Sequence, residues 1–214
     1  MITTNSSFKN STITDSMFNL IVGATLTWGF LMNYFIVQSL SFEWVVQNSV
    51  WISLLYLVSA FSGHVLFEKS DNPVISFIGY NMIVLPVGVL LVPITEGYDA
   101  NVLQTVFLQT ALITGIMMAL GSMFPKFFAK TVGVVSTVVL AIVLSHLASM
   151  IFFGETFGVW YEYVIIVGMS IFIGFYWSYS MSCEKTVDKA IDTAGLLYLP
   201  IINIMSALLG IRRS

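Results

Sequence analysis

The sequence predicts an all-α, polytopic membrane protein with seven transmembrane helices. Of its 214 residues, 57% are hydrophobic and only 9% are charged, and the mean hydropathy is +0.92. Soluble domains carry about 25% charged residues, so composition excludes an ordinary soluble domain. The apolar residues form continuous runs of the length, about 20 residues, that a helix needs to cross a bilayer. Transmembrane β-strands would instead show alternating segments of about ten residues.

Seven such runs follow one another, and the short connections between them hold nearly all the charged residues. The expected spans are 17–41, 44–67, 74–94, 102–124, 127–153, 158–181 and 193–211. No linker or shift in composition divides the chain. We therefore expect a polar N-terminal tail, residues 1–16, and a single seven-helix membrane domain, residues 17–214. The tail lacks the basic start and apolar run of a secretory signal, so the first span is expected to be retained.

Lysine and arginine in the short connections predict the orientation of the chain in the membrane. With seven full spans, six of these residues share the side of the N-terminal tail and two lie on the other side. The six are Lys9, Lys69, Lys126, Lys130, Lys185 and Lys189, and the two are Arg212 and Arg213. The N-terminus is therefore expected in the cytoplasm.

The last span contains Pro200, which leaves two possibilities open. A re-entrant segment that breaks at this proline would bring both arginines to the side of the N-terminal tail. We favour a full seventh helix, because neighbouring helices can satisfy the carbonyl group that a proline frees.

Ionisable side chains within a membrane are rare and usually functional. His146 lies inside the fifth expected span, Glu162 near the start of the sixth, and Asp192 directly before the seventh. His146 could respond to protons in a cavity, since histidine changes charge near neutral pH. We favour a neutral imidazole bonded to a neighbouring helix, because no second deep ionisable residue accompanies it. Glu162 and Asp192 are expected at headgroup level, with a cavity mouth as the alternative place for Asp192.

Several classes of function are disfavoured. The sequence has no HExxH, GxSxG, Walker or CxxC motif, so we expect neither an enzyme nor a cofactor. Ser145 and His146 are adjacent and would point about 100° apart on a helix, so they cannot form a catalytic dyad with each other. A net charge of −3 with scattered basic residues gives no surface for nucleic acid. The lipid bilayer is the expected partner, and protein partners are not predicted.

Three segments together resemble the Bax inhibitor-1 family. The stretch LLYLPIINIMSALLGI, residues 196–211, is similar to the family's closing signature, roughly L-Y-L-D-[IF]-I-N-L-F-x-x-L-L-R. The residues that match in register are Leu197, Tyr198, Leu199, Ile202, Asn203, Leu208 and Leu209. Residues 76–94 resemble the family's third span and residues 17–37 its first.

This resemblance implies a bundle with the last helix at its centre, in which Asn203 would find hydrogen-bond partners on neighbouring helices. It also implies a pH-sensitive calcium leak across the membrane and, in eukaryotes, cytoprotection. Calcium would then be a transported ion and not a cofactor. A bacterial inner membrane is the favoured location, and the endoplasmic reticulum is the alternative.

The chain departs from the family at the positions that carry its mechanism. In leak-competent family members, an aspartate near the end of the sixth span pairs with the aspartate of the closing signature, and such a pair shares a proton as a pH-dependent latch. The corresponding positions here are Ser180 and Pro200. We therefore expect the family bundle without this latch, with any residual pH response arising from His146 or Asp192.

Two functions remain open at this point. The first is a calcium or cation leak, and the alternative is a non-conducting membrane protein that uses the same bundle for interaction or regulation. A water-filled crevice lined by Ser180, Tyr198 and Asn203 would favour transport, whereas a dry core would favour the alternative.

Overall fold

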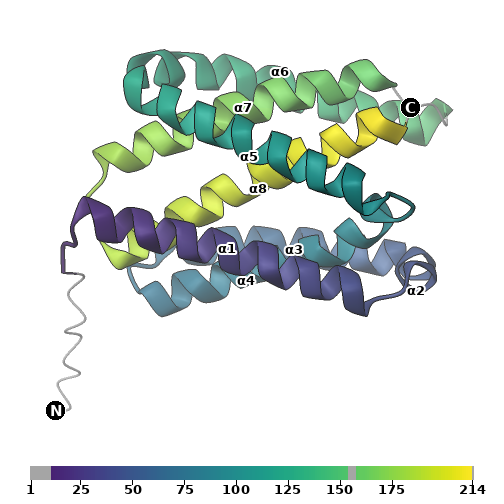
Figure 1. The fold of residues 1–214 in the computed structure, drawn as a ribbon, viewed down its shortest axis with the longest axis horizontal. Helices are drawn as coiled ribbons and strands as arrows, with labels where there is room; N and C mark the ends of the chain where they lie inside the picture. Colours follow the sequence, from purple (N-terminus) through teal and green to yellow (C-terminus); the bar gives the residue numbers. More distant parts are fainter. Residues whose placement is uncertain (1–10, 154–157, 214) are drawn as a thin grey trace, which may run out of the picture. The chain divides into compact units, whose positions relative to one another are not determined.

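Helices account for nearly all of the chain that the computed structural model describes, which comprises residues 11–153 and 158–213 (Figure 1). This part contains eight helices and no strand. In order, they are α1 (Asp15–Ser39), α2 (Phe42–Gln47), α3 (Ser49–Lys69), α4 (Pro73–Thr95), α5 (Ala100–Met123), α6 (Pro125–Phe153), α7 (Val159–Ser182) and α8 (Val187–Arg213). All except α2 are long and apolar enough to cross a membrane. The predicted all-α class with seven membrane-spanning helices is confirmed, and five of the predicted spans agree with the structure within two residues at each end.

The predicted second span, 44–67, begins at the wrong residue. Asn48 separates the short helix α2 from α3, which starts at Ser49. The backbone of Asn48 leaves the helical region, with φ −104° and ψ 12°, and its side-chain amide donates to the carbonyl oxygen of Trp44 at 2.9 Å. An asparagine side chain that bonds nearby backbone competes with helix continuation. Hydropathy alone gives no sign of this break, because apolar residues stand on both sides of it.

The predicted last span, 193–211, starts too late. α8 begins at Val187, after Thr186, whose hydroxyl accepts a hydrogen bond from the backbone N–H of Lys189 at 3.2 Å. This is the arrangement of a helix N-cap. Asp192 therefore lies inside the helix and not before it.

The helix α8 also continues without a break through Pro200 to Arg213. The hydroxyl of Tyr98 donates to the carbonyl oxygen of Leu209 at 2.5 Å, and the guanidinium of Arg213 donates to the carbonyl oxygen of Glu96 at 3.1 Å. The end of α8 is thus held by the connection between α4 and α5. The expected full seventh helix is confirmed, and the alternative, a segment that breaks at Pro200, is wrong.

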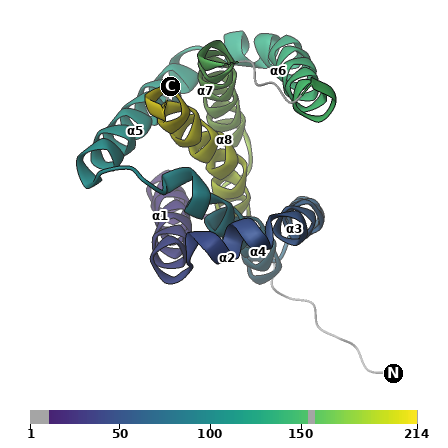
Figure 2. The same ribbon diagram turned by 90° about the vertical axis from the view of Figure 1, so that its right-hand side faces the viewer.

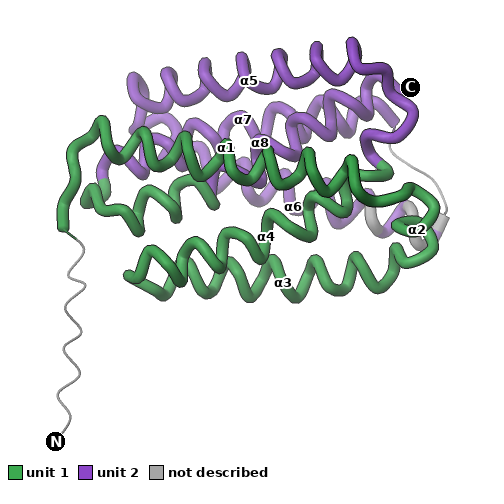
Figure 3. The backbone as a smooth tube through the Cα atoms, turned by 60° about the horizontal axis from the view of Figure 1, so that its bottom comes forward, with its two compact units in different colours: residues 1–93, 183–195 green, residues 94–182, 196–214 purple. Residues whose placement is uncertain are grey.

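The chain divides into two compact units (Figure 3). Unit 1 contains residues 1–93 and 183–195, and unit 2 contains residues 94–182 and 196–214. The helix α8 contributes to both. It is also the most enclosed of the candidate spans: 61% of its most apolar window is buried, against 11–44% in the other six. The central position of the last helix in a bundle and the single membrane domain both stay predictions.

In unit 1, α4 packs closely against α3 and α1. Gly63 on α3 and Gly79 on α4 face each other, and a Cβ atom built on either would lie 2.5–2.6 Å from the other's carbonyl oxygen. On the side of α1, the hydroxyl of Tyr80 donates to the carbonyl oxygen of Thr25 at 2.9 Å. Small residues at such contacts let helix backbones approach closely, as is typical of membrane helices.

In unit 2, α7 packs against both α5 and α6 and lies between them (Figure 2). Gly174 on α7 meets Gly121 on α5, and Gly168 on α7 meets Val139 on α6. Val139 also forms a buried cluster with Ile165 on α7 and Ala207 on α8. These contacts place the second part of α8 in the core of unit 2.

Candidate functional site

The first two turns of α8 carry three charged residues, two of which, Asp188 and Asp192, are buried in unit 1. Asp188 and Asp192 are four residues apart, so their side chains lie one above the other on the same helix face. Lys189 lies between them in the sequence. Ser76, in the first turn of α4, approaches this face from the neighbouring helix. We refer to Ser76, Asp188, Lys189 and Asp192 as the carboxylate cluster.

Short polar contacts join all four residues. The hydroxyl of Ser76 donates to Oδ1 of Asp188 at 2.7 Å. The ammonium group of Lys189 donates to Oδ2 of Asp192 at 2.9 Å and lies 3.9 Å from Oδ2 of Asp188. Both carboxylates are buried, with Asp188 0% and Asp192 7% exposed, whereas the Lys189 side chain is 39% exposed. The lysine thus reaches the buried carboxylates from the surface of the unit.

Local structure explains part of this burial. A helix N-terminus carries partial positive charge, so it stabilises a nearby carboxylate by about 0.3–1 kcal/mol, and more where the geometry is partly buried. Asp188 lies at the start of α8 and is bonded to the start of α4. The ammonium group of Lys189 adds a full positive charge.

These interactions do not fully offset the cost of burying the two carboxylates, because two of the carboxylate oxygens have no hydrogen-bond partner. They are Oδ2 of Asp188 and Oδ1 of Asp192, and both atoms are buried. Each unpaired buried polar atom costs about 1–3 kcal/mol, so native structures keep few of them. Asp71, in the connection between α3 and α4, interacts electrostatically with Asp188 and Lys189 and adds further negative charge. The cluster therefore offers spare anionic oxygen ligands, which suit a cation.

The donor set is small for a resident metal ion. Within residues 11–153 and 158–213, no group of three or more His, Cys, Asp or Glu side chains could hold a metal. Two carboxylates and a hydroxyl would leave much of a calcium shell, which takes 6–8 oxygens, to water. The arrangement therefore suits a cation that binds weakly and exchanges.

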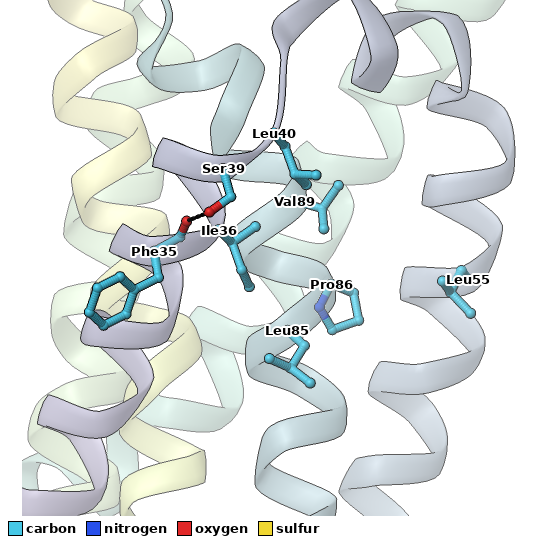
Figure 4. A pocket seen from close by; sticks show the side chains of 8 residues that line it. All are labelled: Phe35, Ile36, Ser39, Leu40, Leu55, Leu85, Pro86 and Val89. Carbon is cyan, nitrogen blue, oxygen red and sulfur yellow. Dashed lines mark hydrogen bonds between the residues drawn. The ribbon is translucent and has the colours of Figure 1, made fainter.

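A groove elsewhere in unit 1 has a different character. It has a volume of about 370 Å³ and lies between α1, α3 and α4, where Phe35, Leu55 and Leu85 line it (Figure 4). Its one hydroxyl, on Ser39, donates to the carbonyl oxygen of Phe35 in the same helix at 2.7 Å. The groove offers no charged ligand, and its lining suits the acyl chains of a bilayer.

The positions that match the family's carboxylate pair are buried in unit 2 and carry no charge. Ser180 is 2% exposed, and its hydroxyl donates to the carbonyl oxygen of Trp177 in its own helix at 2.8 Å. Pro200 is buried inside α8. Tyr198, two residues earlier, is 0% exposed. Neither position supplies a carboxylate, so Asp188 and Asp192 are the buried acidic residues of α8.

Asn203 differs from its expected environment. We expected its amide to bond to neighbouring helices, but the residue is exposed and its amide donates to the carbonyl oxygen of Leu199 at 2.8 Å. A side chain that bonds one turn back along its own helix needs no partner from another helix. Ser180 and Tyr198 are closed to solvent while Asn203 is open, so the three do not share one water-filled crevice.

His146 and Glu162 lie near the start of α7. The ring of His146 stacks on that of Tyr161, with the centroids 4.2 Å apart and the planes at 14°. Glu162, in the first turn of α7, is half-buried against α8: a Cβ atom on Gly210 would lie 2.6 Å from its Oε1. Both residues belong to unit 2, and headgroup level for Glu162 stays a prediction.

Of the residues singled out from the sequence, only Asp192 belongs to the carboxylate cluster. Asp188 and Ser76 were missed. A signal for Asp188 was present: a threonine followed by charged residues, with aspartates four positions apart, is typical of a helix start. Ser76 could not be found in this way, because its role depends on the packing of α4 against α8.

A comparison with models of known protein families and with curated proteins finds no match. The resemblance to the Bax inhibitor-1 family therefore rests on the residues of this chain alone.

Proposed function

We propose that this chain is a Bax inhibitor-1-like integral membrane protein that passes cations, calcium foremost, and that the carboxylate cluster serves this passage. The observation that carries the proposal is the burial of Asp188 and Asp192 in the most enclosed of the candidate spans, with one oxygen on each that accepts no hydrogen bond. The proposal also rests on the match of residues 196–211 to the family's closing signature.

The chemistry of cation passage favours this cluster over the family positions. A dehydrated cation needs anionic or carbonyl oxygens in place of its hydration shell. Ser180 and Pro200 supply no charge, and both are closed off in the core of unit 2. Asp188 and Asp192 supply two carboxylates within one helical turn of each other. In this proposal, the carboxylates that serve cation passage lie nearer the N-terminus of α8 than the family position at Pro200.

The charge pattern supports an orientation for the proposed protein. Lys185 and Lys189 flank the start of α8, whereas Arg212 and Arg213 end it. The larger number of basic residues on the side of the N-terminal tail puts that side in the cytoplasm. The carboxylate cluster then lies at the cytoplasmic end of α8, and a bacterial inner membrane remains the favoured location.

The proposal omits the carboxylate latch of the family. Ser180 and Pro200 cannot share a proton, so acid-dependent closure through these positions is not expected, and any pH response falls to His146 or Asp192. Measuring flux against pH in the wild type, His146→Ala and Asp192→Asn tests this. A steep acid dependence that both variants retain contradicts it.

Reconstitution into liposomes that contain a calcium-sensitive dye tests the main proposal. The full chain is expected to admit Ca²⁺ faster than empty liposomes, and Asp188→Asn and Asp192→Asn to bring the rate toward that of empty liposomes. Asp15→Asn is the matched control, because Asp15 also lies in the first turn of a helix but is exposed. A wild-type rate equal to that of empty liposomes refutes the conducting function. A rate that both cluster variants leave unchanged refutes the role of the cluster.

One observation favours a second function, a non-conducting protein that uses the bundle for interaction. Ser180 and Tyr198 are closed to solvent, so the place where the family's carboxylates would meet water is dry here. This function predicts no flux above that of empty liposomes, so the same assay separates the two.

A further inference from the structure

The start of α6 carries two lysines that no acidic residue accompanies. Lys126 and Lys130 lie four residues apart in the first two turns of the helix, and both are exposed. Residues 100–154 of the sequence contain no aspartate or glutamate. Of the ion pairs among the described residues, none includes either lysine. Two neighbouring ammonium groups therefore lie at the start of a candidate span without a carboxylate beside them.

The helices packed around these lysines in unit 2 add no negative charge at this end. The ends of α5 and α7 meet here, where the indole N–H of Trp177 donates to the hydroxyl of Ser122 at 2.9 Å. Phe128 of α6 packs against Gly174 of α7. The carboxylates in the described part of unit 2 lie at the other ends of these helices, at Glu96, Asp99 and Glu162. The start of α6 is therefore electropositive, and the helix N-terminus adds to its positive charge.

A groove between α6 and α7 begins one turn beyond Lys130. It has a volume of about 330 Å³ and is lined mainly by valines of the two helices. Gly168 and Val139 form its buried part, where a Cβ atom on Gly168 would lie 2.5 Å from Cγ2 of Val139. Its rim is open, since Val134 and Val167 are 67% and 61% exposed. The groove is thus an apolar channel along the two helices that a neighbouring molecule can enter from the side.

The lysines and the groove are in register along α6. Val134 and Val138 follow Lys130 by four and eight residues, so they lie about 6 and 12 Å deeper along the helix. Residues four apart are neighbours on a helix surface, which puts Lys130 beside the outer edge of the groove. After Lys130, α6 contains no Asp, Glu, Lys or Arg. Its two lysines therefore belong at the membrane surface, and the groove belongs in the hydrocarbon below them.

This arrangement fits the two parts of a phospholipid. An ammonium group binds phosphate as a point charge, and two such groups favour a lipid with a net negative charge. A zwitterionic lipid carries a cation of its own, which the lysines repel. The acyl chain matches the groove, because the groove offers apolar side chains and is open to the bilayer along its length.

We propose that Lys126 and Lys130 bind the headgroup phosphate of an anionic glycerophospholipid, and that one acyl chain of this lipid lies in the groove between α6 and α7. The lipid supplies the negative charge that unit 2 lacks at this end. The site goes beyond the proposed function and does not depend on it, because cation passage concerns the carboxylate cluster of unit 1.

Native mass spectrometry of the full chain, purified in detergent and mixed with phosphatidylglycerol or phosphatidylcholine of identical acyl chains, tests the proposal. One basic residue near an anionic lipid surface changes affinity about fivefold. The wild type is therefore expected to prefer phosphatidylglycerol by about 25-fold, and Lys126→Gln and Lys130→Gln each to lose about fivefold of this preference. Lys126→Arg and Lys130→Arg should keep it. Lys69→Gln is the control, since Lys69 is an exposed lysine at the end of α3 in unit 1.

A substitution in the groove tests the place of the acyl chain separately. Val138 is 47% exposed, so Val138→Phe fills the groove without entering the core of the unit. It is expected to weaken the binding of both lipids by the same factor, because both carry the same chains. Leu140→Phe is the matched control, since Leu140 is 59% exposed on α6 and does not line the groove. Inorganic phosphate, which has no chain, is expected not to bind.

Equal affinity of the wild type for the two lipids overturns the proposal. So does a preference for phosphatidylglycerol that the double variant Lys126→Gln/Lys130→Gln retains. Identical lipid binding in Val138→Phe and Leu140→Phe overturns the groove as the place of the acyl chain. The rise in melting temperature that phosphatidylglycerol produces gives a second readout, which should be smaller in the double variant than in Lys69→Gln.

Discussion

The hydroxyl of Ser76 donates a hydrogen bond of 2.7 Å to Oδ1 of Asp188, a residue 112 positions away in the chain. The bond joins the first turns of α4 and α8 where both side chains are buried. Ser76→Ala leaves a third cluster oxygen without a partner. We expect it to destabilise the protein by about 1–3 kcal/mol, the cost of one unpaired buried acceptor. Thermal unfolding in detergent measures this.

The matched control for this substitution is Ser136→Ala. The hydroxyl of Ser136 donates only within its own helix, to the carbonyl oxygen of Val132 at 2.7 Å. Substitutions away from buried networks usually change stability by no more than about 0.5 kcal/mol. An equal loss of stability in the two variants would show that the hydrogen bond of Ser76 contributes no more to stability than a hydrogen bond within one helix.

The facing glycines of α3 and α4 give a second prediction. Gly63→Ala and Gly79→Ala each place a methyl group 2.5–2.6 Å from a carbonyl oxygen of the opposite helix, so the two helices must separate. We expect a loss of about 1–3 kcal/mol, as in overpacked cores. Gly23→Ala, where nothing lies within 4 Å, should be neutral or stabilise α1 by up to about 1 kcal/mol. Unfolding midpoints that fall equally in all three variants would contradict the close approach.

The sequence was sufficient for the number and type of the helices, because a bilayer-length apolar run has few alternatives to a helix. The sequence was not sufficient for the helix boundaries, because a polar residue can either end a helix or lie within one. Asn48 lies within an apolar run and ends a helix, whereas Asp188 and Asp192 lie within a charged stretch and belong to one. Hydropathy averages over a window and cannot distinguish these cases, which depend on single hydrogen bonds.

The candidate site was less predictable than the fold. Asp192 was singled out, but it was placed before the last helix, whereas it lies inside α8 and is buried. Its burial depends on Ser76 and Asp188, and the partner from α4 comes from tertiary packing that no local pattern encodes. The prediction for Asn203 was wrong because its hydrogen-bond partner is local and does not come from tertiary packing. An amide inside an apolar run suggests a buried partner, yet the backbone of its own helix was sufficient.

The end of α8 provides a third prediction. The last carbonyl groups of a helix have no partner within it, and the hydroxyl of Tyr98 satisfies that of Leu209. Tyr98→Phe should leave the fold intact and loosen the last turn by about 1 kcal/mol. Hydrogen exchange of residues 205–213 is expected to accelerate accordingly. Tyr34→Phe, at an exposed tyrosine of α1, should leave that exchange unchanged. Protection that persists in Tyr98→Phe would assign the stability of this turn to Arg213 instead.

The course of α8 across the membrane gives a fourth prediction. Cys183 precedes α8, and Ala100 begins α5 beside the connection that holds the end of α8. In spheroplasts, a membrane-impermeant maleimide added outside should not label Cys183, which we place in the cytoplasm. In a Cys183→Ser background, Ala100→Cys and Ser214→Cys should both be labelled. Labelling of Ala100→Cys from outside, with Ser214→Cys labelled only after the membrane is permeabilised, would mean that α8 re-enters, in conflict with its unbroken course through Pro200. Labelling of Cys183 alone from outside would instead reverse the orientation that the basic residues predict.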